Sequence, residues 1–255
     1  MTLPSKGEFS VKTYERYAEL RPRTFRPSRP RAFAMVMEPT FRKLYSPYLP
    51  AKKDARILDL GSGNGEFLYL MQRAGYESAA GVDLDPKQVE EGRAAGVRNL
   101  VCGNACSMLR DSLGQFDFIS SINMLEHFPK DQLLELLKLI RAALRPGGRF
   151  LCQVPNATTF FLPLFFMDFT HETPFAPTSL KQDFEMTGLV NVRVGGVRPV
   201  VHGVKSAVRF VLWKLIEAGL SFIQLVEQGP TNDLRHIFTA NIFAVGDKKA
   251  DAANA

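Results

Sequence analysis

The sequence predicts an α/β fold, specifically a Rossmann-like, doubly wound sheet of seven strands that is mostly parallel, with an antiparallel last strand and helical insertions. Three observations predict it. Short apolar runs alternate with helical periodicity between residues 56 and 154, which implies a parallel sheet covered on both faces. A glycine-rich turn over 61–65 joins the first strand to the first helix. Polar residues follow the strand ends, where open α/β sheets bind their ligands.

The elements of the first part of the chain follow from these patterns. Each expected strand is a short run rich in apolar residues, and each expected helix repeats apolar side chains at helical spacing. Pro86 stands at a first-turn position that a helix tolerates. The expected strands are 56–60, 78–83, 99–102, 116–122 and 149–154, and the expected helices are 32–45, 65–75, 86–95 and 131–144.

The alternation stops after residue 155. Residues 156–177 form an aromatic insertion without a clean period, and long loops of this kind are usually functional. A helix capped by Thr178 or Ser179 is then expected to end at Gly188. The remaining expected elements are a strand over 189–194, a helix over 204–226 and a last strand over 238–245.

The length of 255 residues suits one domain with insertions. We expect a basic arm and lid helices over 1–50, the domain over 51–248, and a disordered tail over 249–255. Within the domain the insertions are 156–177 and 200–232. Three cysteines without a C-x-x-C pair, no signal peptide and no long uncharged run predict a cytoplasmic protein.

The net charge of +6 is concentrated near the N-terminus, since residues 1–56 hold 13 Lys/Arg and 5 Asp/Glu, a balance of +8. The prolines among the arginines of 21–31 make this segment an extended arm. Such an arm suits phosphate on nucleic acid, on an anionic membrane or on a substrate. A solvated linker explains it equally well, and both readings stay open.

The glycine turn predicts a cofactor site. Glycine permits positive φ and a close approach of ligand to backbone, and the following helix offers free N–H groups. Asp59 precedes the turn and would repel a phosphate but attract a cation. The pattern Asp59-x-Gly61-x-Gly63-x-Gly65 resembles motif I of class I S-adenosylmethionine-dependent methyltransferases. The resemblance implies S-adenosylmethionine as cofactor, held by these residues and Ser62, and makes 51–248 the methyltransferase domain.

The resemblance extends to the next strand ends. It makes Asp83, followed by Leu84, the acid that binds the ribose hydroxyls; a turn-forming aspartate is the alternative. Asn104-Ala105 stands where the family usually has an acid for the adenine amino group, so the match loosens there, although an amide oxygen also accepts. The other residues expected at the cofactor are Asn123, Met124 and, as an aromatic lid, Tyr17.

Histidine is the expected base for methyl transfer to a hydroxyl, because its pKa lies near the working pH. His127 follows the fourth strand, and Glu126 beside it would border the acceptor pocket. His171 lies in the aromatic insertion, where Asp168 could orient its ring. A packing role for His127 and a loop-bracing role for His171 are the alternatives. No metal is expected, since no third ligand is evident.

The segment Asp168-x-x-His171-x-x-Pro174, followed by Ser179-Leu180, resembles methyltransferases of bacterial polysaccharide and glycolipid assembly. This implies a sugar hydroxyl, a lipid-linked or nucleotide-linked glycan, or another small molecule as acceptor. A nucleic-acid methyltransferase is the alternative enzyme, disfavoured because the end of the fourth strand lacks the motifs of base methylation. An inactive cofactor-binding scaffold is the third reading. The helix over 204–226 suits a membrane interface, a homodimer or the protein's own core, of which packing on the fold or a second subunit is favoured.

Overall fold

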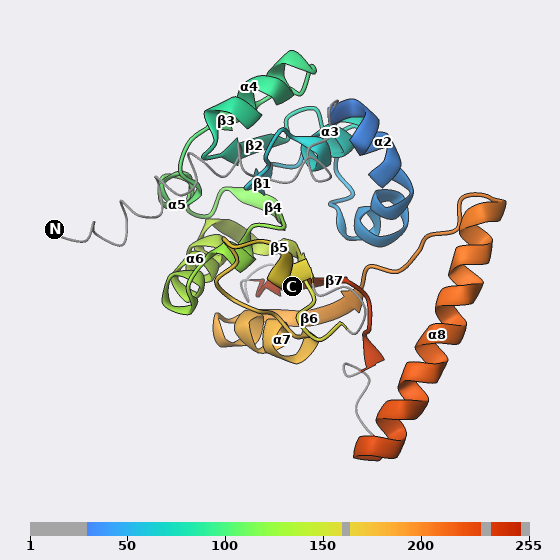
Figure 1. The fold of residues 1–255 in the computed structure, drawn as a ribbon. Coiled ribbons are helices and arrows are strands. Elements are labelled where there is room, and N and C mark those ends of the chain that lie inside the picture. The colour runs from blue at the N-terminus through green and yellow to red at the C-terminus, as the bar shows by residue number, and fades with distance from the viewer. Residues whose placement is uncertain (1–29, 160–163, 231–235, 251–255) are drawn as a thin grey trace, which may run out of the picture.

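The computed structural model describes residues 30–159, 164–230 and 236–250, and it shows one seven-stranded sheet between two helical layers (Figure 1). The strand order is β3-β2-β1-β4-β5-β7-β6. The strands are β1 (Ile57–Leu60), β2 (Ala80–Asp83), β3 (Leu100–Cys102), β4 (Phe116–Ile122), β5 (Leu144–Pro155), β6 (Leu189–Gly196) and β7 (Asn241–Lys248).

Strands β1 to β5 pair in parallel, whereas β7 runs antiparallel to both of its neighbours, β5 and β6. The expected doubly wound sheet with an antiparallel last strand is therefore confirmed. The chain moves outward from β1 to β3 and then returns to place β4 on the other side of β1. The switch point between β1 and β4 is the position where such sheets bind ligands.

Two separate clusters of apolar side chains attach the helices to the sheet. One cluster joins one face to α2 (Pro30–Thr40), α3 (Glu66–Arg73) and α4 (Pro86–Ala94). The other joins the opposite face to α5 (Ala105–Arg110), α6 (Lys130–Ala143) and α7 (Pro177–Met186). Burial on both faces explains why the strands appear in the sequence as continuous apolar runs rather than as alternating ones.

Several boundaries differ from the expected ones for local reasons. The helix α5 was not expected, because its six residues are too few to show a period. Ala176, not Thr178 or Ser179, is the N-cap of α7, and the Ser179 hydroxyl bonds back to the Ala176 backbone. The helix expected over 32–45 changes at Thr40, after Pro39, into a π-helical turn (Phe41–Tyr45) and then a 3₁₀ turn (Ser46–Tyr48).

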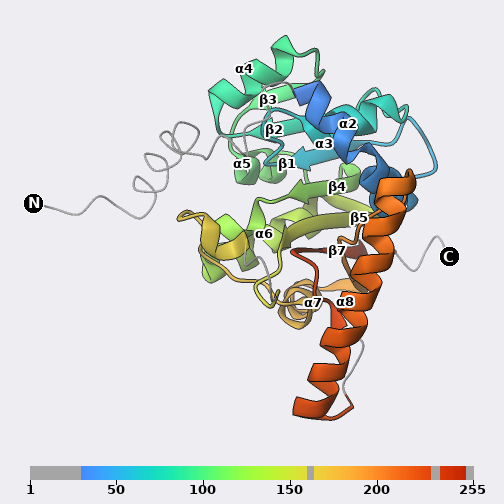
Figure 2. The ribbon, with the colours of Figure 1, turned by 45° about the vertical axis from the view of Figure 1, so that its right-hand side comes forward.

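The helix α8 (Val204–Gln228) lies at the outer edge of the molecule, and Figures 1 and 2 both show one of its ends extending beyond the sheet. Its apolar stripe was expected to pack on the fold or on a second subunit. Within the protein itself this is wrong, because Val204, Leu215 and Phe222 of that stripe are 83%, 66% and 66% exposed. A single helical period identifies an apolar face but not what covers it.

Among the described residues, no helix has the length and hydropathy needed to cross a bilayer. Residues 21–29 of the predicted arm, the lid residue Tyr17 and most of the predicted tail lie outside the described residues. Pro30 and Arg31, the last two residues of that arm, begin α2 instead of being extended.

Candidate active site

The glycine turn between β1 and α3 depends on backbone conformations that favour glycine. Gly61, Gly63 and Gly65 have φ values of +63°, +55° and +82°. A Cβ on Gly61 would lie 2.7 Å from the side chain of Met124, and one on Gly65 would lie 2.7 Å from Val97. The turn therefore combines left-handed backbone with close packing, which explains why this position of the chain carries three glycines.

Asp83 at the end of β2 holds this turn. Its Oδ2 accepts a hydrogen bond of 2.7 Å from the Gly63 N–H, and its Oδ1 accepts one of 2.9 Å from the Asp85 N–H. The fold thus brings the predicted ribose-binding acid directly beside the glycine turn. The alternative, a turn-forming aspartate, also describes what the side chain does, because the bond to Asp85 closes the turn that leads into α4. Leu84, the other residue predicted here, is 43% exposed.

Asp59 lies beneath the turn and not on its surface. Its side chain is buried, and Oδ1 accepts a hydrogen bond of 2.6 Å from the Ser120 hydroxyl on the adjacent strand β4. Burial raises the pKa of Asp59 to about 7; the bond from Ser120 opposes the rise, and the charges of Asp83 and Glu66 add to it. Near neutral pH this carboxyl group is therefore poised between its two protonation states. Its predicted attraction for the cofactor's positive charge stays a prediction.

Asn104 begins α5 as its N-cap, with Oδ1 accepting a hydrogen bond of 3.1 Å from the Ser107 N–H. Capping accounts for a side-chain acceptor at this position but not for an amide in place of an acid, since asparagine and aspartate cap helices equally well. A carbonyl oxygen has two lone pairs, so a contact with the adenine amino group stays a prediction for Asn104. Ala105 is the first residue of the helix that Asn104 caps.

Asn123 and Met124 follow β4 at the switch point. Asn123 has a φ of +54°, and its Oδ1 accepts a hydrogen bond of 3.1 Å from Gln153 Nε2 on β5. Gln153 in turn accepts a hydrogen bond from the buried Tyr45 hydroxyl. Because Met124 lies against Gly61, the residues that follow β4 and β1 form one continuous wall.

His127 ends the 3₁₀ turn Leu125–His127 and bonds to the aromatic insertion. Its Nδ1 lies 2.9 Å from Thr170 Oγ1 and 3.2 Å from the Thr170 carbonyl oxygen. The Thr170 hydroxyl donates to Asp168 Oδ1 over 2.7 Å. We assign the proton of neutral His127 to Nδ1, since the carbonyl can only accept and the hydroxyl proton is given to Asp168. This tautomer carries its lone pair on Nε2, as a general base requires.

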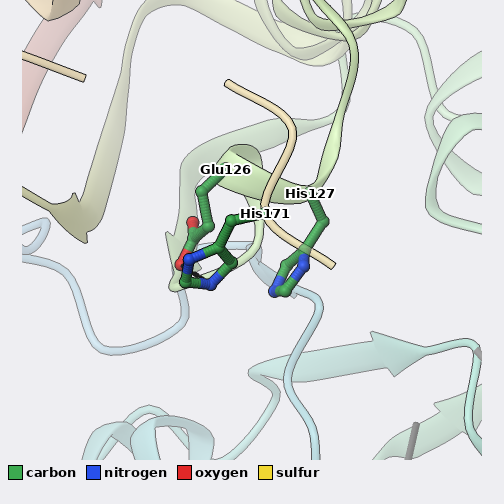
Figure 3. A group of neighbouring side chains, drawn as sticks. All are labelled: Glu126, His127 and His171. Atoms are coloured by element: carbon green, nitrogen blue, oxygen red, sulfur yellow. Dashed lines mark ion pairs between the residues drawn. The ribbon is translucent and has the colours of Figure 1, made fainter. Parts of the chain in front are cut away.

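His171 lies beside His127, with ring centroids 4.8 Å apart, and Figure 3 shows the Glu126 side chain next to His171. The Nδ1 of His171 is 2.7 Å from the Phe165 carbonyl oxygen, and its Nε2 is 3.9 Å from Glu126 Oε1. The bond to Phe165 shows that His171 does brace its loop. Glu126 is fully buried, so a positively charged His171 would stabilise its carboxylate.

Glu126, His127 and His171 place one ligand atom each within 4.8 Å of one another. A carboxylate and two imidazoles are a donor set suited to a divalent transition metal. The sequence showed no third ligand because Glu126 and His171 are 45 positions apart. The fold provides one, so these three residues are where a metal could be held.

The aromatic insertion is attached to the turn after β4 through the main chain. The Glu126 carbonyl oxygen accepts hydrogen bonds from the N–H groups of Glu172 and Thr173, over 2.7 and 3.0 Å. The Thr173 hydroxyl donates to the Phe128 carbonyl oxygen over 2.7 Å. These bonds hold the segment that carries His171 beside the segment that carries His127.

Within the insertion, Asp168 contacts the residue that joins it to His127. Its Oδ1 accepts hydrogen bonds from the Thr170 N–H and hydroxyl, and the Thr170 hydroxyl lies beside His127 Nδ1. The expected orientation of His171 by Asp168 stays a prediction. Sequence reasoning also missed Thr170, Ser120 and Gln153. Only the spacing Asp168-x-Thr170, typical of a turn in which an aspartate accepts from the backbone two residues later, could have indicated Thr170.

A hollow of about 460 Å³ lies at the opposite edge of the sheet, lined by Tyr48, Arg149, Arg193 and Asp247 among others. Arg149, on β5, forms an ion pair with Asp247 on β7, and Nε of the arginine lies 2.7 Å from Oδ1 of the aspartate. The glycine turn and His127 follow the carboxyl ends of β1 and β4, and His171 lies beside His127. This hollow is therefore not part of the candidate active site.

The protein-family model described as "Methyltransferase domain" matches residues 26–194, about two thirds of the chain. The chain belongs to the methyltransferase family. The matched region contains the glycine turn, Asp83, both histidines and their aromatic insertion, and it ends within β6, before α8.

Curated relatives match a shorter part of this methyltransferase. It is 34% identical over 115 residues to the tRNA U34 carboxymethyltransferase of Cellvibrio japonicus, and 28% identical over 107 residues to the 27-O-demethylrifamycin SV methyltransferase of Amycolatopsis mediterranei. These alignments cover 42% and 40% of the chain and only 34% and 39% of the two relatives. The substrates in these names are therefore stated for those two proteins and not for this chain.

A solved structure supports the fold over almost the whole chain. The crystal structure of a SAM-dependent methyltransferase from Archaeoglobus fulgidus superimposes with a TM-score of 0.66 and 22% identity. The superposition covers 91% of this chain and 100% of the other. At this identity the likeness shows the fold alone, which is the Rossmann-like methyltransferase fold.

S-adenosylmethionine is the cofactor of this methyltransferase. The residues present fit it on the observations above. The turn leaves no room for a Cβ at Gly61, and Asp83 ends β2 beside the turn. The carboxyl group of Asp59 under the turn accepts its hydrogen bond from a neutral hydroxyl, that of Ser120.

Proposed function

We propose that this methyltransferase methylates a hydroxyl group of a small molecule, with a sugar or a lipid-linked or nucleotide-linked glycan as the leading acceptor class. One observation carries the proposal: Thr170 and Asp168 hold Nδ1 of His127 as a donor, which gives Nε2 the lone pair needed to take a hydroxyl proton. A preformed base suits a hydroxyl acceptor, whose proton must be removed as the oxygen is methylated.

S-adenosylmethionine supplies an electrophilic methyl group on a sulfonium. This methyl group would pass to the acceptor oxygen as the C–S bond breaks with its electron pair left on sulfur, and Nε2 of His127 would accept the acceptor proton. The protein's part is to align the oxygen and to hold the imidazole. The Thr170–Asp168 pair stabilises the imidazolium that forms, because the Nδ1–H bond leads to a carboxylate.

The position of the site supports the proposal. His127 lies three residues after Met124, which contacts the glycine turn, so the base is close to the cofactor's expected place. His171 and the buried Glu126 border the same space. The relative from Amycolatopsis mediterranei is named for methylation at an oxygen, which favours this chemistry.

The test is transfer of a labelled methyl group from S-adenosylmethionine to sugar nucleotides, lipid extracts and tRNA in parallel. We expect label in a glycan-bearing fraction, and we expect His127→Ala to keep cofactor affinity while turnover falls roughly 100-fold or more. Unchanged turnover in His127→Ala would contradict the assigned base.

RNA methylation is the second candidate. The relative from Cellvibrio japonicus is named for a tRNA, and 13 of the chain's 32 Lys/Arg lie in residues 1–56. Label in tRNA that is lost as the salt concentration rises would replace the glycan proposal with this one.

A further inference from the structure

The helix α8 presents an unusually large apolar surface to solvent. Ten of its large hydrophobic residues are between 43% and 83% exposed: Val204, Val208, Val211, Leu212, Leu215, Ile216, Phe222, Ile223, Leu225 and Val226. At roughly 100 Å² for each residue, this surface is on the order of 1,000 Å², which exceeds the largest apolar patch of a typical monomer. A surface of this size on a soluble domain indicates a partner.

The charged residues of α8 border this apolar surface. At about 100° per residue, an arc of roughly 180° without charge runs from Lys214 on one margin to Lys205 on the other. Arg209 lies just beyond Lys205, and all three cations are exposed. The only other charged residues of α8 are Glu217 and, at the far end of the helix, Glu227.

The opposite side of α8 faces the protein and carries both polar and apolar residues, since Phe210 and Trp213 are half-buried there. Ser206 and Glu217 are buried there, together with Leu220. Glu217 accepts hydrogen bonds from Arg198 over 3.0 Å and from Lys214 over 2.7 Å. An ordinary surface helix buries its apolar side and exposes its polar side. In α8 the buried side is the mixed one, and the fold directs the broad apolar side without charge outward.

The arrangement of side chains favours a lipid surface over a second copy of the helix. The spacing of Val204, Val208, Val211 and Leu215 does suit a helix–helix seam. The apolar surface continues past that seam to Leu212 and Val226, however, at flanking positions where two-stranded coiled coils carry charges. A bilayer interface covers a broad face, and the cations at its margins complement anionic headgroups.

We propose that α8 docks this methyltransferase on an anionic lipid surface, lying in the plane of the interface with Val211 and Leu215 in the acyl region. Lys205 and Arg209 then reach the lipid phosphates, while Glu217 keeps the helix joined to the protein through Arg198. At about 37 Å for 25 residues, the helix contacts the surface along its whole length. This proposal does not depend on the identity of the methyl acceptor.

The test is flotation of the full chain with two kinds of vesicle, phosphatidylglycerol mixed with phosphatidylcholine and phosphatidylcholine alone. We expect flotation with the anionic vesicles and little with the neutral ones. Val211→Glu/Leu215→Glu should abolish it, and Lys205→Glu/Arg209→Glu should weaken it roughly tenfold or more. Leu113→Glu is the matched control, because Leu113 and Val211 are both 57% exposed and Leu113 lies outside α8.

Two further measurements keep the result interpretable. Thermal unfolding shows whether each variant folds, and the emission of Trp213, the single tryptophan of the chain, shows whether α8 keeps its place against the protein. The proposal is overturned if the wild-type protein fails to float with anionic vesicles. A dimer by light scattering that Val211→Glu/Leu215→Glu dissociates, without flotation, would assign the surface to a second copy instead.

Discussion

The Thr170 hydroxyl lies 2.9 Å from Nδ1 of His127, although the two residues are 43 positions apart. This contact joins the segment after β4 to the aromatic insertion and determines which imidazole nitrogen carries the proton. We therefore expect the proposed reactivity of His127 to depend on Thr170.

Thr170→Val should reduce kcat roughly tenfold or more while the KM for both substrates changes little, because it removes the nearer of the two acceptors of the His127 Nδ1 proton and leaves only the carbonyl oxygen of residue 170. The pH profile should also move, with the basic form of His127 appearing at lower pH once the link to the Asp168 carboxylate is lost. Steady-state kinetics across pH measure both effects. Thr187→Val is the control, since Thr187 bonds only to helix carbonyls in α7. A Thr170→Val enzyme with the wild-type pH profile would contradict the positioning role.

Asp83→Ala should weaken binding of S-adenosylmethionine roughly 100-fold, because a carboxylate that accepts from ribose hydroxyls and from the Gly63 N–H contributes about 3 kcal/mol. Isothermal titration calorimetry measures the loss. Asp85→Ala is the matched control two residues away, since Asp85 caps α4 and its removal should lower stability by about 1 kcal/mol without affecting affinity. Equal losses of affinity in both variants would show that Asp83 acts only through the turn.

Much of this site was predictable because its parts are local. The glycine turn follows a buried strand within a few residues, and Asp83 ends the next strand, so periodicity and turn chemistry locate both. Parallel strands then bring these residues to one edge of the sheet. The same reasoning placed Asn123 and Met124 after β4.

The contacts of the insertion were not predictable for the opposite reason. Residues 164–175 have no period, and they are placed by bonds such as Glu172 N–H to the Glu126 carbonyl oxygen, which leave no trace in the spacing of side chains. The contact of Asp168 with Thr170 depends on that placement. For α8 the periodicity of the sequence predicted the helix and its apolar side correctly. Only the structure shows that this apolar side faces outward.

Gly61→Ala should both destabilise the protein and reduce its affinity for S-adenosylmethionine. Its Cβ would meet Met124 at 2.7 Å in a backbone with a φ of +63°. Gly147→Ala is the control, because Gly147 has a φ of +75° and nothing within 4 Å of the added atom. The control should lose only the backbone contribution of about 1–2 kcal/mol. Urea denaturation and calorimetry of the two variants should therefore differ, and matching results would mean that the contact with Met124 does not shape the site.

Asp59 should make the stability of the cofactor-free protein fall as pH rises from about 4 to about 7. The folded protein retains the Asp59 proton up to its raised pKa of about 7, whereas the unfolded chain releases it near 3.8. The folded state binds more protons in this window, so the free energy of unfolding decreases with rising pH and levels off above it. Asp59→Asn removes this contribution and should gain a few kcal/mol relative to the wild type between about pH 4 and 8. Urea denaturation of the wild type and of Asp59→Asn at about pH 4 and about pH 8 measures the free energy of unfolding of each. If this free energy changes with pH by the same amount in both proteins, the prediction is contradicted.

Added Zn²⁺ should inhibit turnover, and a chelator should restore it. Glu126, His127 and His171 offer three zinc ligands within 4.8 Å of one another, and zinc bound there would occupy the Nε2 lone pair that the proposed base uses. His171→Ala removes one ligand without removing the base, so its residual turnover should be less sensitive to Zn²⁺ than that of the wild type. Affinity for S-adenosylmethionine, measured at the inhibitory zinc concentration, should stay unchanged because the glycine turn and Asp83 are not among the ligands. The opposite result would be activation by a divalent metal that is lost in His171→Ala and in the presence of a chelator. That result would make the ion a participant in the reaction, and His127 would no longer be the sole means of removing the acceptor proton.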